Sequence, residues 1–130
     1  MERKVITDKD GRQWVIYNNA IGKSRAIPLE IAVRESQLRV AFFSEEAVPI
    51  LLASFQELGV FPELRLVGSA NLVAATAESD LDILPVIFDD KLYKPTLEAC
   101  LTIRRKLYQG TLGNFTPLYR INLHDVYFED

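Results

Sequence analysis

Two short apolar segments, residues 64–67 and 81–88, are the feature that most limits how this chain can fold. Each has the length of one strand. Gly68-Ser69 follows the first segment at once, and Asp80-Leu81-Asp82 opens the second. Pro85 interrupts the second segment, and because proline cannot donate to a sheet ladder, we expect an edge or a bulge there. The centre of the chain therefore predicts two strands and a connecting segment with polar ends.

A helix is predicted before the first of these strands. Ser44 is a good N-cap residue, and apolar residues recur at helical spacing from there to Leu58. Pro49 must lie in or near the first turn, and Gly59 suits the end of the helix.

The second half of the chain continues the alternation of helices and strands. Residues 70–77 suit a short helix between the two apolar strands. Pro95 opens a further helix, which carries Cys100 on its apolar side and which Gly110 ends. The last predicted strand is Leu118 to Phe128.

The N-terminal residues Val5 to Tyr17 are typical of a β-hairpin. Asp10-Gly11 is a strong signal for a two-residue turn, since both central residues of a type I′ turn need a positive φ. Residues 18–24 look like a loop. A two-residue turn at this place pairs Thr7 with Trp14 and Val5 with Ile16.

Residues 27–43 allow two interpretations. Leu29, Ile31 and Val33 alternate with more polar residues, which favours a strand, and Glu35-Ser36 could turn the chain into a second strand. A helix over the same residues stays open, because short apolar runs fit both periods.

This order of elements predicts an α/β or α+β fold with a mixed sheet and flanking helices. The 130 residues suit one domain. We expect an N-terminal β extension over residues 1–43 and a core over residues 44–130.

Composition narrows the function. The net charge of −3 argues against a large nonspecific nucleic-acid surface. No stretch approaches the roughly 18 apolar residues of a membrane helix, and the N-terminus lacks an apolar signal segment, so we expect a cytoplasmic protein. Cys100 and His124 are the only residues of their types. Zinc sites of the usual kinds and histidine triads are therefore disfavoured, and carboxylates must carry any catalysis.

Asp80 and Asp82 are two residues apart at the start of a strand, so both point to the same face. Two neighbouring carboxylates repel each other, and Mg²⁺ offsets that cost while it binds substrate phosphates. Gly68 and Ser69 stand where a strand would lead into a helix, a place where a phosphate can approach the backbone. This pattern indicates metal-assisted phosphoryl or nucleotidyl transfer.

The run VGSANLVAATAESDLDILPVI, residues 67–87, resembles the motif of the DNA polymerase β-like nucleotidyltransferase superfamily, in particular its minimal bacterial members. The resemblance implies Mg²⁺ binding by Asp80 and Asp82 and binding of a nucleoside triphosphate, such as ATP, by Gly68 and Ser69. The family usually has a Gly four residues after the Ser, where this chain has Val73, and a basic residue after Gly-Ser, which is absent here.

The family also uses a third carboxylate on a later strand. Asp125 and Asn122 both fit that place in the sequence, and Asp125 is the slightly favoured candidate for the third catalytic residue. With Asn122 there, activation of the acceptor hydroxyl would be lost.

Three functions follow from these observations. The first is transfer of a nucleoside monophosphate from a nucleoside triphosphate to an acceptor hydroxyl. A partner protein is a candidate acceptor, as in antitoxin-like members of the family. The second is a catalytically inactive module that binds a nucleotide or a partner, and the third is an unrelated interaction domain. An apolar surface on the N-terminal strands would suggest a homo-oligomer. Arg104-Arg105-Lys106 and His124 are more simply explained as surface residues.

Overall fold

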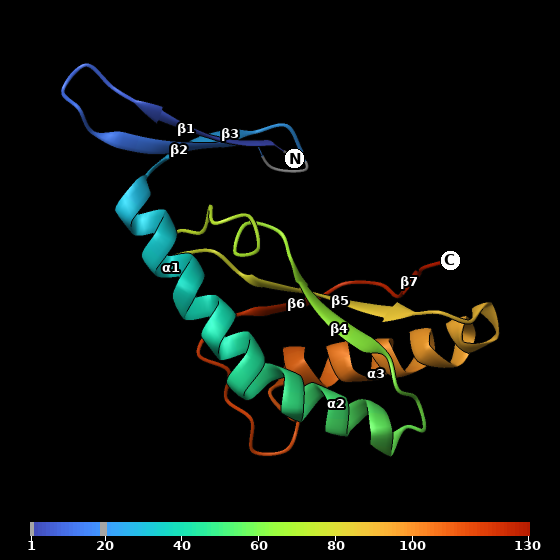
Figure 1. Cartoon of the computed structure of the whole chain (residues 1–130). Helices are drawn as coiled ribbons and strands as arrows, with labels where there is room; N and C mark the ends of the chain where they lie inside the picture. Colours follow the sequence, from blue (N-terminus) through green and yellow to red (C-terminus); the bar gives the residue numbers. More distant parts are fainter. Residues whose placement is uncertain (1, 19–20) are drawn as a thin grey trace.

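Two β-sheets and three α-helices form the computed structural model, which describes residues 2–18 and 21–130 (Figure 1). This is the predicted α+β fold with a mixed sheet and an N-terminal hairpin. No described helix is long and apolar enough to cross a membrane. The strands are β1 (Glu2–Thr7), β2 (Gln13–Asn18), β3 (Ser24–Pro28), β4 (Glu63–Val67), β5 (Leu81–Ile87), β6 (Ile121–Leu123) and β7 (Tyr127–Phe128); the helices are α1 (Leu29–Phe42), α2 (Val48–Glu57) and α3 (Tyr93–Gln109).

The second sheet is built around β5. Strand β4 pairs with it antiparallel, while β6 and β7 pair with its other side in parallel. Alternate residues of β5 (Leu81, Ile83, Ile87) are buried in the core that α2 and α3 also supply. Helices α2 and α3 lie against this face of the sheet (Figure 1). Asp82 alternates with Leu81 and Ile83 along β5, so its side chain points to the other face.

Pro85 lies in this central strand, and the expected irregularity falls on the neighbouring strand. Odd-numbered residues of β5 exchange backbone hydrogen bonds with the β6 and β7 side, and Pro85 has no N–H to give. Opposite it the partner is interrupted: β6 ends at Leu123 and β7 begins at Tyr127. The free carbonyl of His124 accepts a hydrogen bond from Cys100 Sγ at 3.2 Å. The single strand predicted over residues 118–128 is thus two short ones.

The N-terminal hairpin has a register one residue away from the predicted one. Val5 pairs with Val15, and Thr7 pairs with Gln13. The Asp8 side chain accepts hydrogen bonds from the N–H groups of Asp10 and Arg12, and Gly11 has a φ of 82°. These contacts build a three-residue loop with a left-handed glycine in place of the two-residue turn. In the predicted loop 18–24, residues 19–20 lie outside the described residues.

The strands favoured over residues 29–43 are wrong, because α1 occupies this segment. Its buried residues Ala32, Ser36, Arg39 and Phe42 are spaced for a helix, but two of them are polar and so escape a search for apolar periodicity. A π-helical turn, η1 (Phe43–Ala47), leads directly into α2. The continuous helical segment crosses the expected boundary between residues 43 and 44.

Ser44 acts differently from the prediction in this continuous segment, whereas Pro49 lies in the first turn of α2, as expected. Ser44 Oγ hydrogen bonds to the carbonyls of Val40 and Ala41, so Ser44 is not an N-cap. Pro49 would clash with the carbonyl of Glu45 in a regular helix, and the π turn is the local adjustment. Gly59 follows the end of α2 with a φ of 80°, as expected.

Residues 70–77 do not form the expected helix. They make a single turn, closed by the hydrogen bond from Leu72 N to Gly68 O at 3.2 Å. Val73 then takes a φ of 54°, a left-handed conformation that stops helix propagation. The helix predicted at Pro95 is confirmed as α3, which starts two residues earlier and ends at Gly110 with a φ of 70°.

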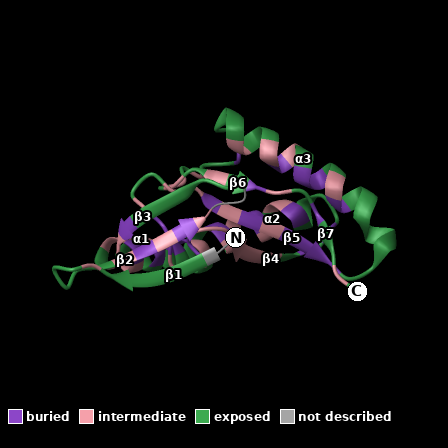
Figure 2. Ribbon diagram, turned by 90° about the horizontal axis from the view of Figure 1, so that it is seen from above, coloured by how far each residue is buried: buried purple, intermediate pink, exposed green. Residues whose placement is uncertain are grey.

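Two apolar clusters hold the molecule together. The larger one joins α2, α3 and the second sheet. The smaller one lies under the N-terminal sheet and consists of Val15, Tyr17, Ile27, Ala32 and Ala74. Figure 2 shows β5 largely buried and β1 exposed. The smaller cluster fixes the N-terminal sheet over the segment that connects β4 to β5.

Candidate functional site

Asp80, Asp82 and Ser69 line one pocket of about 320 Å³. Asp82 lies on strand β5, and Asp80 is the residue directly before this strand. Ser69 lies in the turn that follows β4. The remaining lining residues are Tyr17, Arg25, Ala74, Glu78 and Ser79. The four motif residues thus meet at one place, with Gly68 beneath Asp82. Four larger hollows, of about 580, 480, 450 and 620 Å³, are lined by none of these residues.

Asp82 is the most highly connected carboxylate of the pocket. Its Oδ1 accepts a hydrogen bond from Asn122 Nδ2 at 3.0 Å and lies 3.2 Å from His124 Nε2. A Cβ atom on Gly68 would come within 2.4 Å of Asp82 Oδ2. Gly68 therefore makes room for the Asp82 carboxylate. The sequence motif had predicted that this glycine makes room for a phosphate.

Asp80 is more open. Arg120 Nε lies 4.0 Å from its Oδ2, and the Arg120 side chain is 81% exposed. Such an exposed pair contributes little to stability. The Asp80 carboxylate is accordingly accessible to a ligand.

Asn122 lies beside Asp82, and Asp125 contacts a different part of the protein. Asn122 is the register partner of Asp82 across β5 and β6. Asp125 Oδ1 pairs with Arg104 of α3 at 2.8 Å, and Arg104 Nε also binds the carbonyl of Leu123. The slight preference for Asp125 as the third site residue is therefore at odds with these contacts, because alternation along the chain directs Asn122 and His124 toward Asp82 and Asp125 toward the helix.

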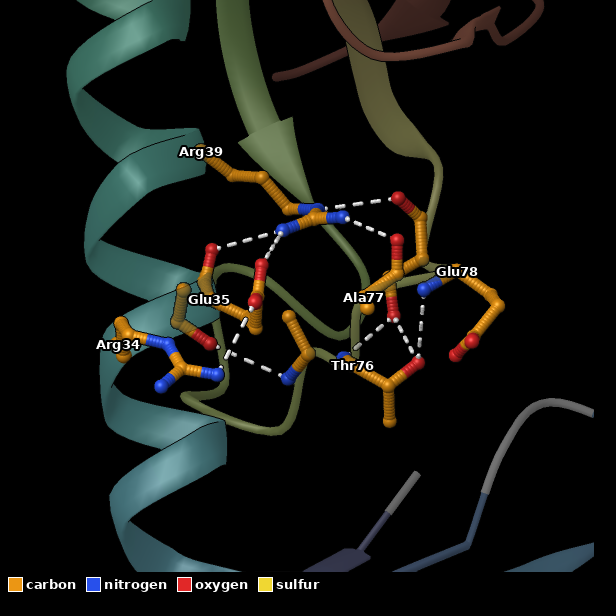
Figure 3. A network of polar contacts seen from close by, with 9 residues as sticks. Arg34, Glu35, Arg39, Thr76, Ala77 and Glu78 are labelled. Atoms are coloured by element: carbon orange, nitrogen blue, oxygen red, sulfur yellow. Dashed lines mark hydrogen bonds and ion pairs between the residues drawn. The ribbon is translucent and has the colours of Figure 1, made fainter.

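A buried arginine fixes the loop that leads to Asp80. The Arg39 side chain is 1% exposed and binds Glu35 Oε2 at 2.8 Å. It donates to the carbonyls of Ser79 at 3.0 Å and Ala77 at 3.3 Å, so these hydrogen bonds tie the loop to α1 (Figure 3). The guanidinium also lies 4.3 Å from the Tyr119 ring.

One side chain of the loop and one of α1 add further restraint. Ser79 Oγ accepts a hydrogen bond from Thr76 N at 2.9 Å (Figure 3). Ser36 Oγ accepts one from Ala75 N at 3.1 Å. Ser79 thus shapes the turn directly before Asp80.

Tyr17 and Arg25 are site residues that the sequence did not reveal. They are partners across β2 and β3, and both line the pocket. Burial of Tyr17 raises the pKa of its phenol, the nearby Asp82 charge raises it further, and Arg25 lowers it in part. No local motif marks these two residues, because only the packing of the N-terminal sheet brings them to Asp82.

The pocket suits a hard cation in its donor chemistry. Two carboxylates with room for phosphate oxygens are the arrangement in which Mg²⁺ is commonly held. Within residues 2–18 and 21–130, no three His, Cys, Asp or Glu side chains cluster as a set of metal ligands. The acidic side chains that line this pocket are Glu78, Asp80 and Asp82.

Cys100 packs in the core, as expected for a cysteine on the apolar side of a helix. Burial raises the pKa of its thiol to about 11. A thiol this basic is not a nucleophile at neutral pH.

No protein-family model, curated protein or solved structure matches this chain.

Proposed function

We propose that the pocket around Asp80 and Asp82 is a nucleotidyltransferase-type site that binds a nucleoside triphosphate, such as ATP, together with Mg²⁺. The observation that carries the proposal is the meeting of Ser69 with both carboxylates in one pocket. Two carboxylates and a hydroxyl are suited to a metal-bound polyphosphate.

The local geometry supports the resemblance on which the proposal rests. The Gly-Ser turn follows a strand that is antiparallel to the Asp-x-Asp strand, and the next strand pairs with the latter in parallel. Val73 has a φ of 54°. This is the conformation for which glycine is the natural residue, and the family usually has Gly at this position.

Asp80 and Asp82 would hold the Mg²⁺, which would neutralise phosphate charge. Ser69 would donate to a phosphate oxygen, and Gly68 keeps the Asp82 carboxylate close to the turn. The reaction that such a site supports is transfer of a nucleoside monophosphate to an acceptor hydroxyl, for which a partner protein is our candidate. We propose a cytoplasmic location, in keeping with a single cysteine that forms no disulfide.

Asn122 favours a second candidate, nucleotide binding without efficient transfer. A neutral amide donates to Asp82 and cannot take a proton from an acceptor hydroxyl. Asp125, the other candidate base, is paired with Arg104. Binding is therefore the part of the function that the site supports best.

Thermal unfolding with and without ATP and Mg²⁺ tests the binding. A ligand at a hundred times its Kd stabilises the folded state by about 2.7 kcal/mol, which corresponds to a rise in Tm of roughly 10 °C for a domain of this size. The rise should require Mg²⁺ and vanish in Asp80→Ala/Asp82→Ala. The control is Asp90→Ala/Asp130→Ala, which removes two exposed carboxylates outside the pocket. No Mg²⁺-dependent shift with any triphosphate would contradict the proposal.

Transfer is tested separately with an α-labelled triphosphate. Label that becomes covalently attached to an added acceptor or to the protein, and that depends on Asp80 and Asp82, supports the transferase. Binding without such label supports the second candidate.

A further inference from the structure

We propose that Arg25, on strand β3 of the N-terminal sheet, binds the triphosphate in this pocket. The inference rests on the proposed function and extends it, because it assigns phosphate recognition to a sheet outside the segment that carries the motif.

The charge balance of the pocket calls for a cation. Three acidic residues, Glu78, Asp80 and Asp82, line the pocket. Arg25 is the one basic residue in this described lining. The segment from Gly68 to Asp82 contains no Lys or Arg. A polyphosphate brings further negative charge, which one Mg²⁺ on two carboxylates offsets only in part. Arginine is well suited to the remainder, since its planar guanidinium forms paired hydrogen bonds with phosphate oxygens.

Arg25 lies on the face of the N-terminal sheet that covers the turn after β4, at Gly68 and Ser69. Arg25 lies directly opposite Tyr17 in the β2–β3 register, so both side chains are on the same face. Tyr17 is 5% exposed and packs with Ala74 of the connecting segment, which identifies this face as the one that covers the turn. Figure 1 shows the segment between β4 and β5 lying under this sheet.

The position of the sheet is fixed by contacts on both sides of Tyr17. Arg3, the partner of Tyr17 on β1, donates from Nε to the carbonyl of Val73 at 3.3 Å. Val15 and Ile27 continue the buried face toward α1. Arg25 is therefore held on a packed scaffold, a requirement for a group that positions a ligand.

Arg25 is also available for a ligand. Among the described residues, no acidic side chain forms an ion pair with it, whereas Arg12, Arg39, Arg65, Arg104 and Arg120 each have a carboxylate within 4.0 Å. Arg120 contacts Asp80 but lines the hollow along α3 and β6.

Isothermal titration of Arg25→Gln with three probes tests the assignment. The probes are Mg²⁺ with ATP, Mg²⁺ with inorganic tripolyphosphate, and adenosine. Loss of a charge-assisted contact should weaken ATP and tripolyphosphate alike by about tenfold or more, and should leave adenosine unchanged. Arg25→Lys, which keeps the charge and loses the planar fork, should fall between the two. Arg12→Gln is the matched control, because it removes a positive charge from the tip of the same sheet and does not line the pocket.

The outcomes separate this inference from the proposed function. Equal affinity of wild type and Arg25→Gln for ATP overturns the assignment of Arg25 and leaves the pocket as the nucleotide site. An equal loss for Arg12→Gln also overturns it, since the effect would then be that of net charge. Wild-type protein that binds neither ATP nor tripolyphosphate overturns both. Arg25 is exposed, so the variant should unfold within a few degrees of wild type, and Arg25→Lys gives the same comparison with the charge retained.

Discussion

Asn122 is the register partner of Asp82 across the parallel strands β5 and β6, and its side-chain amide donates to Asp82 Oδ1 at 3.0 Å. A carboxylate at this position would place a third acid directly beside Asp80 and Asp82. The amide instead donates a hydrogen bond to one of these two acids. Under the proposed function, Asn122 is therefore the residue that would separate nucleotide binding from turnover.

Asn122→Asp should make the free energy of unfolding depend on a metal ion. In EDTA a second carboxylate against Asp82 replaces a hydrogen bond with repulsion, and we expect a loss of about 1–2 kcal/mol in the free energy of unfolding. Mg²⁺ should restore it. Asn122→Ala is the control, which loses the hydrogen bond and should gain no response to Mg²⁺. Urea unfolding with and without Mg²⁺ measures both, and an Asn122→Asp protein that ignores Mg²⁺ would contradict a cation site at Asp82.

Gly68→Ala should disturb Asp82 beyond the ordinary cost of an alanine at positive φ. Gly68 and Gly59 have nearly equal φ values, 79° and 80°, but only Gly68 has a neighbour in the path of a Cβ atom, Asp82 Oδ2 at 2.4 Å. Gly59→Ala should cost about 1 kcal/mol and Gly68→Ala about 2–3 kcal/mol. Gly68→Ala alone should also weaken Mg²⁺-dependent nucleotide binding. Equal effects of the two substitutions on stability would mean that Asp82 is not held against the turn.

Val73→Gly should stabilise the protein, since Val73 has a φ of 54°. Relief of left-handed strain, about 1–2 kcal/mol, exceeds the entropy cost of a glycine, about 0.5–1 kcal/mol. We expect a net gain of roughly 0.5–1 kcal/mol in thermal or urea unfolding. Val73→Ala keeps the strain and shortens the side chain, so it should show no gain. A Val73→Gly protein less stable than the wild type would show that packing by the valine outweighs the strain.

Arg39→Met should loosen the loop before Asp80. Arg39 is buried and has four hydrogen bonds to Glu35, Ala77 and Ser79, so we expect a loss of about 3 kcal/mol and faster proteolysis within the loop. Arg34→Met is the matched control, because Arg34 pairs with the same Glu35 at 3.6 Å while 64% exposed. It should cost at most about 0.5 kcal/mol. Similar losses for both variants would refute the role of Arg39 as the anchor.

The sequence was most informative where local chemistry decides the structure. Apolar length and alternation predicted β5, and glycine predicted the ends of α2 and α3. Helix α1 was only the less favoured of two interpretations, because Ser36 and Arg39 are buried on its inner face and their partners are loop backbone groups distant in sequence. The hairpin register was missed because one side chain, Asp8, reorganises the turn.

The residues of the candidate site also fall into those that a local motif predicted and those that only distant contacts bring together. Asp80, Asp82 and Ser69 were found from a motif and meet in one pocket. Tyr17 and Arg25 were not found, because a sheet from a separate part of the chain brings them there. The choice between Asn122 and Asp125 depended on strand register, which the sequence left open.

Titration of ATP into wild-type protein and into Asp82→Asn, each in excess Mg²⁺ and again in EDTA, tests the central claim most directly. Asp82→Asn changes the charge and almost none of the shape, so the fold is preserved while a metal ligand is lost. The account predicts saturable binding of one ATP by the wild type in Mg²⁺, no binding in EDTA, and affinity at least about tenfold weaker in Asp82→Asn. Equal affinity of the two proteins, or wild-type binding that is unchanged in EDTA, would contradict a metal-dependent nucleotide site at Asp82.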